Sequence, residues 1–371
     1  MAADNNLERF ALKNIKEIKE NLGDEKINFI VLLDRANGYD KTEGNWTDTK
    51  ILELHKNTEI NDDVVLKLGE KDIADISSLN EFLEFVSKYY PSDKFALNIW
   101  SHGFGVYPDC KIYNLRSLIQ DYTTGYSDDD SFSIIDFAKV LKEFKDVQNK
   151  KIDILQFDCC LMQMIEILWQ LKDCADFIIG SETELPGNGS NYSEIYKNLT
   201  TNSTVKDCVH NIVTDFEKKY KNTIVSCTYA VADMENFENF SKSFKIFLDE
   251  LVNNKDIDFS VINNKREELY KYDDSFCEYA DFKSFLYTFE NQILAYPLLE
   301  NIFFKVLEDY DDFILNSCTT NAYAGVLSGF GINIPYTEKL YSYYNQQSAD
   351  YLDIYKDTVL NQIIEKIIYS E

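Results

Sequence analysis

Hydrophobic and polar positions along the chain repeat with two different periods. Short apolar runs are typical of buried strands, and they lie at residues 26–34, 94–100, 152–157, 176–181 and 223–232. Apolar residues at every third or fourth position predict helices at 6–22, 77–89, 134–144, 161–171 and 205–219. Strands that alternate with helices predict an α/β fold, in which a mostly parallel central sheet carries helices on both faces.

The pattern changes near the middle of the chain. From 237 to 313 the spacing is helical, rich in Phe, Tyr, Glu and Lys, and without the alternation of a strand. A late strand at 324–334 and a helix at 351–369 follow. We therefore expect three parts, which are an α/β core over 1–236, a helical subdomain or insertion over 237–313, and a final strand and helix over 314–371 that complete the core.

One predicted strand ends in residues that can carry chemistry. The run 152–157 leads into Asp158, Cys159 and Cys160, and the next predicted helix begins at residue 161. Open α/β sheets bind their ligands at the carboxyl ends of parallel strands, and a helix N-terminus favours a thiolate. The sequence therefore predicts a reactive thiol at this corner.

A reactive thiol needs a basic partner, and the chain has three histidines. His102 directly follows the strand 94–100 in a Ser-His-Gly turn, so two neighbouring parallel strands would bring it to the same edge of the sheet as Cys160. His55 lies in a polar, charged stretch and His210 lies in a predicted helix, and both are interpreted as ordinary residues. His102 and Cys160 are the candidate pair.

Seven short motifs extend this picture over nearly the whole chain. They are Ala3-Asp-Asn-Asn-Leu7, Tyr90-Pro91, Trp100-Ser-His-Gly103, Phe157-Asp-Cys-Cys-Leu-Met162, Gly180-Ser-Glu-Thr-Glu-Leu-Pro-Gly-Asn-Gly189, Ala230-Val-Ala-Asp233 and Gly329-Phe-Gly-Ile-Asn-Ile-Pro335. In this order they resemble the clostripain-like cysteine peptidases, which share a fold with caspases, legumain and gingipains. The resemblance implies a caspase-like α/β/α sandwich with a helical C-terminal subdomain, and a protein or peptide substrate.

The resemblance also implies roles for individual residues. Cys160 would attack a peptide carbonyl, while His102 activates the thiol and later protonates the leaving amine. The backbone N–H groups of Gly103 and Cys160 would form the oxyanion hole. The family pattern has a small residue before the nucleophile, which assigns Cys159 to a buried position. The expected reaction is endopeptidase cleavage, and no third catalytic residue is expected.

Relatives often cleave after Arg or Lys, using acidic side chains in the pocket for the residue before the cut. Asp158 matches one of these acids, and its alternative interpretation is a cap on the following helix. The position of the second acid is occupied by Asn188, which is neutral but can hydrogen-bond a guanidinium or ammonium group. Thr183 and Glu182 are further candidates for substrate binding, or ordinary polar residues at a strand exit. Cleavage after Arg or Lys is expected.

The composition limits the partners of the protein. Lys and Arg total 37 against 64 Asp and Glu, which gives a net charge of −27, so nucleic acids and anionic membranes are not expected partners. We interpret this charge chiefly as a solubilising surface. The eight cysteines are too sparse for a disulfide framework. We find neither an apolar run long enough to span a membrane nor a leader segment, and the resemblance implies an extracellular or cell-envelope location.

No cofactor is expected, and calcium is the candidate metal because some relatives require it. Two acidic clusters, Asp128-Asp129-Asp130 and Asp309-Tyr-Asp-Asp312, could bind it, but neither has spaced ligands around a turn glycine. A solvated acidic surface is the favoured interpretation, and we assign no metal ligand. The long polar loop 107–133 contains few basic residues, so self-cleavage there is not expected. We expect a monomer.

Two alternatives to an endopeptidase stay open. A catalytically silent relative could bind peptides through the same crevice, although the presence of both His102 and Cys160 argues against it. An acyl hydrolase or transferase could use the same pair on a substrate that is not a peptide.

Overall fold

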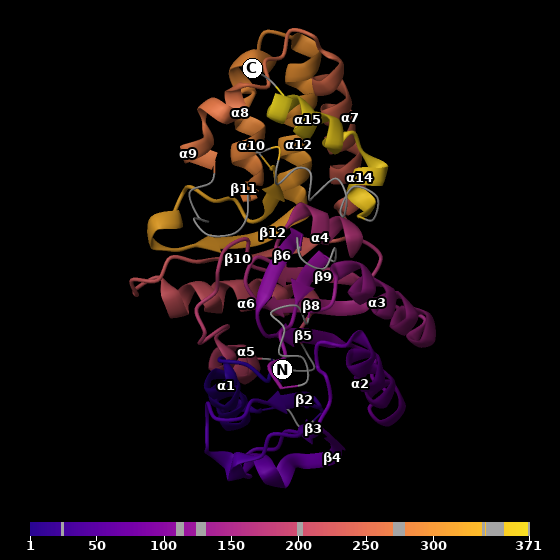
Figure 1. Cartoon of the computed structure of the whole chain (residues 1–371), viewed down its shortest axis with the longest axis vertical. Helices are drawn as coiled ribbons and strands as arrows, with labels where there is room; N and C mark the ends of the chain where they lie inside the picture. The colour runs from indigo at the N-terminus through magenta and orange to yellow at the C-terminus, as the bar shows by residue number, and fades with distance from the viewer. Residues whose placement is uncertain are drawn as a thin grey trace.

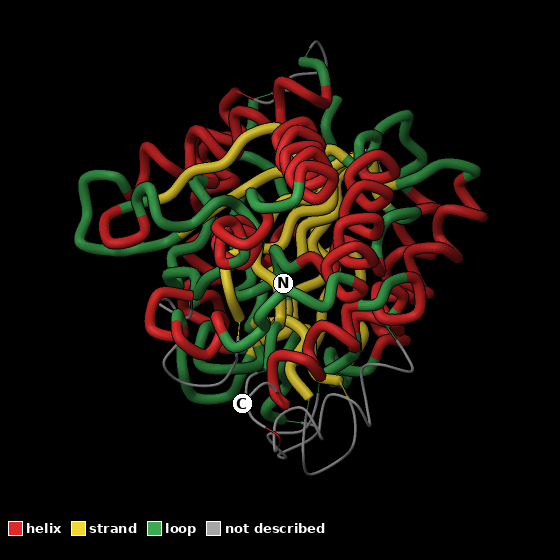
Figure 2. The backbone as a smooth tube through the Cα atoms, turned by 90° about the horizontal axis from the view of Figure 1, so that it is seen from above, coloured by secondary structure: helices red, strands yellow, loops and turns green. Residues whose placement is uncertain are grey.

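A five-stranded mixed sheet lies in the middle of the molecule, with helices on both of its faces (Figures 1 and 2). The computed structural model describes residues 1–23, 26–108, 115–123, 131–198, 203–269, 279–335, 338 and 352–369. The strands follow the spatial order β12 (Ile314–Thr319), β10 (Thr228–Asp233), β9 (Ala175–Gly180), β8 (Ile152–Asp158) and β5 (Ala96–Trp100). β5, β8 and β9 are parallel, whereas β10 and β12 are antiparallel to their neighbours. The α/β class is confirmed, and the sheet is more mixed than the alternation of elements predicts.

Each face of this sheet buries its own hydrophobic cluster, because successive side chains of a strand point to opposite sides. On one face Phe157 of β8 packs against Phe137, with ring centroids 5.9 Å apart. On the other face Tyr229 of β10 stacks on Phe216 at 4.4 Å. The helices that supply these contacts are α3 (Ile134–Gln148) and α4 (Ile165–Gln170) on the first face and α6 (Val205–Tyr220) on the second.

A second, four-stranded sheet forms the N-terminal end of the molecule, at the bottom of Figure 1. Its strands are β1 (Ala2–Ala3), β2 (Ile30–Arg35), β3 (Thr49–Glu53) and β4 (Val64–Gly69), in that order. The helices of this end are α1 (Glu8–Asn21), α2 (Ile76–Tyr89) and α5 (Tyr192–Asn198), with the 3-10 turns η1 (Glu43–Asn45) and η2 (Ile60–Asp63). The Ser101 hydroxyl donates to the Ala2 carbonyl at 3.0 Å and so joins β1 to the end of β5.

The opposite end of the molecule is helical. Its elements are α7 (Phe237–Asn253), α8 (Val261–Asn264), α9 (Arg266–Leu269), α10 (Phe282–Thr288), α11 (Glu290–Ile293), α12 (Pro297–Phe313), α14 (Asp353–Asp357) and α15 (Leu360–Tyr369). Most of the described residues between 237 and 313 lie in helices, of which α7 begins at 237 and α12 ends at 313. The proposed division into three parts stays a prediction. One hydrophobic cluster runs from the central sheet into this end, where Trp169 of α4 contacts Phe237 edge-on at 5.2 Å.

Several short elements were not predicted. β12 is an edge strand that pairs with β10 alone, so its half-buried residues lack an apolar run, and the 3-10 turn η3 (Asn321–Tyr323) follows it. β11 (Tyr279–Asp281) interrupts the helical stretch and pairs with β13 (Gly331–Asn333). The late strand expected over 324–334 is therefore only as long as β13. β6 (Gly103–Pro108) and β7 (Leu115–Leu118) form a separate antiparallel pair just after β5.

The helix expected immediately after the cysteine pair begins four residues later than predicted, at Ile165. Leu161 has φ of 60°, and its N–H donates to the Thr183 carbonyl at 3.1 Å. The N–H of Gln163 donates to the Ser181 carbonyl at 2.9 Å. The chain therefore runs beside the loop that leaves β9 before it coils. The prediction that the thiol lies in the first turn of a helix was wrong, because the apolar pattern of this segment reflects burial and not helical periodicity.

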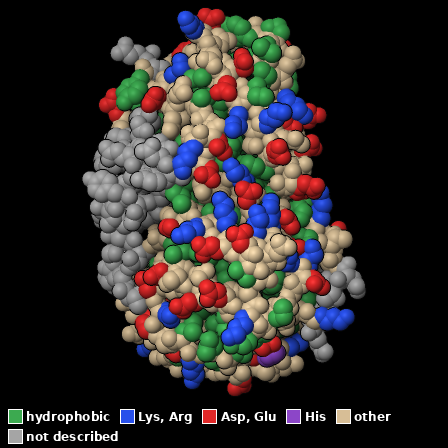
Figure 3. Space-filling view, turned by 90° about the vertical axis from the view of Figure 1, so that its right-hand side faces the viewer, with side chains coloured by type: hydrophobic (Ala, Val, Ile, Leu, Met, Phe, Trp, Pro, Cys, Tyr) green, Lys and Arg blue, Asp and Glu red, His purple; other side chains and the backbone are tan. Residues whose placement is uncertain are grey.

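The surface carries mixed charge. On the face shown in Figure 3, Lys and Arg side chains lie among Asp and Glu side chains over its whole length. Among the described residues, no helix combines the length and apolar character needed to cross a membrane.

Glu166 joins α4 to the β11–β13 pair. Its side chain is fully buried, and its carboxylate accepts the N–H of Asn333 at 2.9 Å. Burial raises the pKa of Glu166 to about 8, because water cannot solvate the charged form there.

The change Glu166→Gln should stabilise the protein in a pH-dependent way. The folded-state pKa of about 8 lies above the ordinary 4.5, so the stabilisation from the protonated acid is complete below pH 4.5 and is lost as the pH rises towards 8. Glutamine keeps an acceptor but cannot ionise. The variant should match the wild type near pH 4.5 and exceed its free energy of unfolding by about 3–5 kcal/mol near pH 8. Urea unfolding at both pH values measures this, with the exposed Glu20→Gln as control. Equal stability at pH 8 would contradict the prediction.

Candidate active site

The parallel pairing of β5 with β8 sets the geometry of the site. Trp100, the last residue of β5, lies opposite Asp158, the last residue of β8. The two chains therefore leave the sheet at the same edge, and His102 and Cys160 each follow two residues later. The expectation that these residues come from neighbouring parallel strands is confirmed.

Gly103 brings the histidine chain into direct contact with the cysteine pair. A Cβ atom at this position would lie 2.3 Å from the carbonyl oxygen of Cys160 and 2.8 Å from the Cβ atom of Cys159. Both distances are far below van der Waals contact, so no larger side chain fits without a backbone shift. The absence of a side chain at Gly103 is thus a steric requirement of the site.

The two cysteines have different surroundings. Cys159 is buried, and its thiol donates to the carbonyl of Ile99 at 3.3 Å. Cys160 is partly exposed, and its Sγ accepts the N–H of Leu185 at 3.2 Å. Burial, together with the nearby carboxylates of Glu184 and Asp158, raises the pKa of Cys160 to about 11. The accessible thiol is therefore neutral at pH 7.

The raised thiol pKa corrects a second expectation. A helix dipole was expected to favour the thiolate, but α4 begins five residues beyond Cys160 and has six residues. The positive end of a helix acts over its first turn, so it does not lower this pKa. The thiol must be activated by its neighbours instead.

His102 is oriented by an asparagine from the N-terminal turn. Its Nε2 lies 2.7 Å from the Oδ1 of Asn6. Because Oδ1 is an acceptor, Nε2 carries the proton and donates, and Nδ1 is left as the basic nitrogen. Burial lowers the pKa of His102, which keeps the imidazole neutral at pH 7. Asn6 lies in one of the motifs of the sequence, but nothing in the sequence marks it as the partner of His102.

A hydrogen-bonded unit holds this turn in place. The Asn5 side chain donates to the carbonyls of Ala2 at 3.1 Å and of Gln120 at 3.0 Å. The N–H of Tyr122 donates to the Asp4 carbonyl at 2.9 Å. The N–H of Ile119 donates to the His102 carbonyl at 3.2 Å. The N-terminal turn, the end of β5 and residues 119–122 are therefore joined into one unit.

Asp158 is buried behind the loop that leaves β9. Its carboxylate accepts the N–H of Ser190 at 3.0 Å and the hydroxyl of Tyr192. Gly189, with φ of +56°, packs so closely that an added Cβ would lie 2.3 Å from Oδ2 of Asp158. Burial raises the pKa of Asp158, while Tyr192, Ser190 and Lys219 oppose this shift. Its interpretation as a helix cap was wrong, because α4 has Met164 at its N-cap.

Lysines of the chain itself lie on the loop expected to bind a basic substrate. The Oδ1 of Asn188 accepts the Nζ of Lys13 at 2.8 Å. Lys219 donates to the carbonyls of Asn188, Gly189 and Ser190 at 2.8, 3.0 and 2.8 Å. The loop therefore already carries two positive charges, and that of Lys219 acts on Asp158.

The remaining candidates are placed as follows. Thr183 is buried, and its hydroxyl lies 3.1 Å from that of Ser181, so it supports the loop from within. Glu182 is also buried, and it accepts the N–H of Gly329 at 3.1 Å. His55 and His210 are exposed and lie outside this unit, as interpreted from the sequence.

The structure describes only one of the two acidic clusters that the sequence suggested for calcium. Residues 128–130, and much of the loop 107–133, lie outside the described residues. In the other cluster, Asp309 pairs with Lys305 at 2.9 Å and Asp311 pairs with Lys283 at 2.6 Å. The six cysteines that the structure describes are all free.

Comparison with known proteins places the chain in a family. A statistical model of the clostripain family matches residues 1–366, so the chain belongs to this family of cysteine peptidases. It is 24% identical over 217 residues to clostripain of Hathewaya histolytica, and this match covers 53% of the chain and 40% of that protein. The matched part is therefore less than half the length of that relative.

Solved structures show the same fold. A secreted cysteine protease of Bacteroides thetaiotaomicron, iotapain, gives a TM-score of 0.73 at 18% identity and covers 96% of this chain and 97% of its own. An inactive zymogen protease of Parabacteroides distasonis gives a TM-score of 0.71 at 21% identity, and the match covers 96% of this chain and 95% of that one. A secreted cysteine protease of Bacteroides thetaiotaomicron in complex with an irreversible peptide inhibitor gives a TM-score of 0.65 at 20% identity. The match covers 94% of this chain and 97% of that one. The expected caspase-like fold is confirmed.

Alkylation by iodoacetamide should report the difference between the two cysteines. Cys160 should react slowly at pH 7 and about tenfold faster per pH unit up to pH 9, because only the thiolate reacts and its pKa is about 11. Cys159 should stay unmodified in the native protein. Peptide mass spectrometry measures both rates, with the half-buried Cys208 as an internal comparison. Fast labelling of Cys160 at pH 7, or earlier labelling of Cys159, would show that the site is not as described.

Proposed function

We propose that this protein is a cysteine endopeptidase in which Cys160 is the nucleophile and His102 is its general base and acid. The observation that carries the proposal is the contact at Gly103, which holds the histidine turn against the cysteine pair at the edge of the sheet. The exposure of Cys160 and the burial of Cys159 support the choice of nucleophile. The peptide inhibitor bound to one related structure supports a peptide substrate.

The resting pair is a neutral thiol beside a neutral imidazole. Burial raises the pKa of Cys160 and lowers that of His102, so neither group is charged at pH 7. We infer that a bound substrate displaces the N–H of Leu185 from Sγ. The Nδ1 of His102 then takes the thiol proton as sulfur attacks the carbonyl carbon.

The remaining steps use the same two groups. The imidazolium returns its proton to the leaving amine, and a thioester is left on Cys160. A water molecule gives up a proton to His102, attacks the thioester and releases the new carboxyl end. The N–H groups of Gly103 and Cys160 are proposed as donors to the oxyanion, each worth about 3 kcal/mol of the barrier. Asn6 acts as a positioning residue. Its Oδ1 accepts the hydrogen bond of Nε2, so Nδ1 stays unprotonated and can act as the base.

The proposed cleavage position is after Arg or Lys, with Asp158, Asn188 and Thr183 around the side chain before the cut. Asp158 supplies one negative charge, and Lys219 lies close enough to oppose it. Asn188 supplies none, and Lys13 occupies its side-chain oxygen. We therefore expect a measurable but modest preference for Arg and Lys over neutral residues.

Fluorogenic peptide amides with Arg, Lys, Ala or Glu before the reporter group test the proposed activity. The wild type should release the reporter, and Cys160→Ala should lower kcat/KM by more than about 10³-fold because no other group can form the thioester. Cys159→Ala is the matched control and should keep most of the activity. Thermal unfolding checks that both variants fold.

Each other outcome points to an alternative. Undiminished turnover by Cys160→Ala would refute the assigned nucleophile. Peptide binding without turnover of any amide would favour a catalytically silent relative. Hydrolysis of esters or thioesters, with no hydrolysis of amides, would favour an acyl hydrolase.

The combined change Asn188→Asp with Lys13→Met should strengthen the preference for Arg. It adds a carboxylate to the loop and removes the lysine that would neutralise it. The ratio of kcat/KM for the Arg substrate to that for the Ala substrate should rise by about tenfold, since one additional partly buried charge pair is worth roughly 1–2 kcal/mol. Lys13→Met alone and the distant Asn149→Asp serve as controls. An unchanged ratio would show that the loop does not contact the side chain before the cut.

A further inference from the structure

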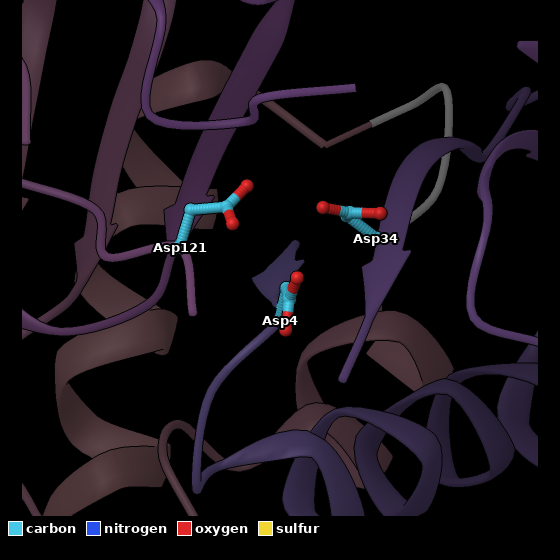
Figure 4. Close-up of side chains that lie close together, drawn as sticks. All are labelled: Asp4, Asp34 and Asp121. Atoms are coloured by element: carbon cyan, nitrogen blue, oxygen red, sulfur yellow. The ribbon is translucent and has the colours of Figure 1, made fainter. Parts of the chain in front are cut away.

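Three buried aspartates from distant parts of the sequence meet beside the segment that holds His102. Asp4 follows β1, Asp34 lies in β2, and Asp121 follows β7. One carboxylate oxygen from each lies within 4.8 Å of the other two. Figure 4 shows the three carboxylates directed towards one shared space.

The oxygens of Asp4 and Asp34 that face this space lack hydrogen-bond partners. Asp4 and Asp34 are 0% exposed, and Asp121 is 1% exposed. Neither oxygen of Asp4 has a hydrogen bond of good geometry, and Oδ2 of Asp34 has none. Among the described residues, no Lys or Arg forms an ion pair with Asp4 or Asp34. Buried carboxylates without partners are rare in proteins because desolvation of their charge is costly.

The other oxygens are satisfied in a way that fixes the orientation of the cluster. The two oxygens of Asp121 accept the N–H groups of Ile73 at 2.9 Å and Thr123 at 3.0 Å. The Oδ1 of Asp34 accepts the Thr49 hydroxyl at 2.8 Å. These bonds hold Asp34 and Asp121 so that their carboxylates face Asp4.

Mutual repulsion makes the cluster unfavourable as it stands. Burial raises the pKa of Asp34 to about 8, and Asp121, Asp4 and Glu70 contribute to this rise, while the Thr49 hydroxyl opposes it. Burial likewise raises the pKa of Asp4 to about 6, with Asp121 and Glu70 adding to the shift and the Thr123 hydroxyl opposing it. A cation in the shared space would relieve both the desolvation and the repulsion.

We propose that Asp4, Asp34 and Asp121 bind one calcium ion. The donors are carboxylate oxygens alone, which suits a hard cation and does not suit zinc or copper. Oxygens on opposite sides of a bound calcium ion lie about 4.6–5.2 Å apart, because each Ca–O distance is about 2.3–2.6 Å. The three oxygens, one from each aspartate, all lie within 4.8 Å of one another, so one ion can reach all three. Magnesium needs shorter distances and a stricter octahedron, so it should bind more weakly.

The bound ion would also help to position His102, and this part of the inference rests on the proposed function. Asp4 lies two residues before Asn6, whose Oδ1 orients the imidazole. Asp121 lies two residues after Ile119, whose N–H holds the His102 carbonyl. A calcium ion between Asp4 and Asp121 would fasten the two segments that position the histidine.

Calcium titration of the whole protein tests the site without reference to catalysis. After treatment with EDTA and its removal, isothermal titration with CaCl₂ should show one ion bound per chain. At a calcium concentration of about 100 times the dissociation constant, the midpoint of thermal unfolding should rise by about 4 °C. MgCl₂ at the same concentration should give a smaller rise. No heat and no change in unfolding with calcium would overturn the proposal.

The variant Asp34→Asn separates metal binding from folding. It should lose the calcium-induced rise, yet in EDTA it should unfold at the same temperature as the wild type or higher, because it removes a buried charge. Asp4→Asn should also lose the calcium-induced rise, and it replaces Asp34→Asn in the test if that variant does not fold. The control Asp312→Asn changes an exposed acid on α12 and should keep the full response. A full calcium response in both Asp34→Asn and Asp4→Asn would overturn the proposal.

Activity then tests the link to His102. EDTA should lower kcat for the best peptide amide more than it raises KM, and calcium should restore it in the wild type but not in Asp34→Asn. Binding of calcium with an unchanged kcat would reject the positioning role. Because the ion is counted by titration and not by turnover, failure of the metal site is distinguishable from failure of the proposed peptidase.

Discussion

The parallel pairing of β5 with β8 is the interaction on which the rest of the site depends. Its register sets Trp100 opposite Asp158, so the two chains reach the edge of the sheet together. A shift of one residue would turn every side chain of β5 to the other face of the sheet, which the two separate hydrophobic clusters forbid. Gly103 then brings the chains into contact beyond the sheet, where hydrogen bonds of the ladder no longer hold them. The positions of imidazole and thiol thus follow from core packing.

The N-terminal sheet supplies the residue that orients the ring of His102. The central sheet brings His102 to the edge, but the orientation of its ring depends on Asn6, which follows β1. The turn that carries Asn6 is in turn held by Ser101 and by residues 119–122. The cluster of Asp4, Asp34 and Asp121 spans the same segments, so its charge lies next to the parts of the chain that place the histidine. Both sheets therefore contribute residues to the proposed active site.

The sequence predicts the parts of this arrangement that depend on short-range patterns. Apolar runs mark β5 and β8, and the small number of histidines points to His102. The start of α4 was misplaced because residues 161–164 are apolar for a tertiary reason, namely their position beside the loop that leaves β9. Contacts between distant residues left no local pattern either. Asp4, Asp34 and Asp121 have no regular spacing, whereas the contiguous acids that suggested calcium, such as Asp309 and Asp311, are paired with lysines.

The proposed preference for basic residues would depend on local charges and not on the net charge of −27. Salt screens exposed charges beyond about 8–10 Å, and Lys and Arg are mixed with the acids on the face in Figure 3. Lys13 and Lys219 lie within hydrogen-bonding distance of the loop that contains Asn188, which is well inside this screening length. Asp158 already has internal partners in Ser190 and Tyr192. A basic substrate side chain would therefore compete with lysines of the chain itself, so the long-range field can guide a peptide to the surface but cannot select the residue that is cut.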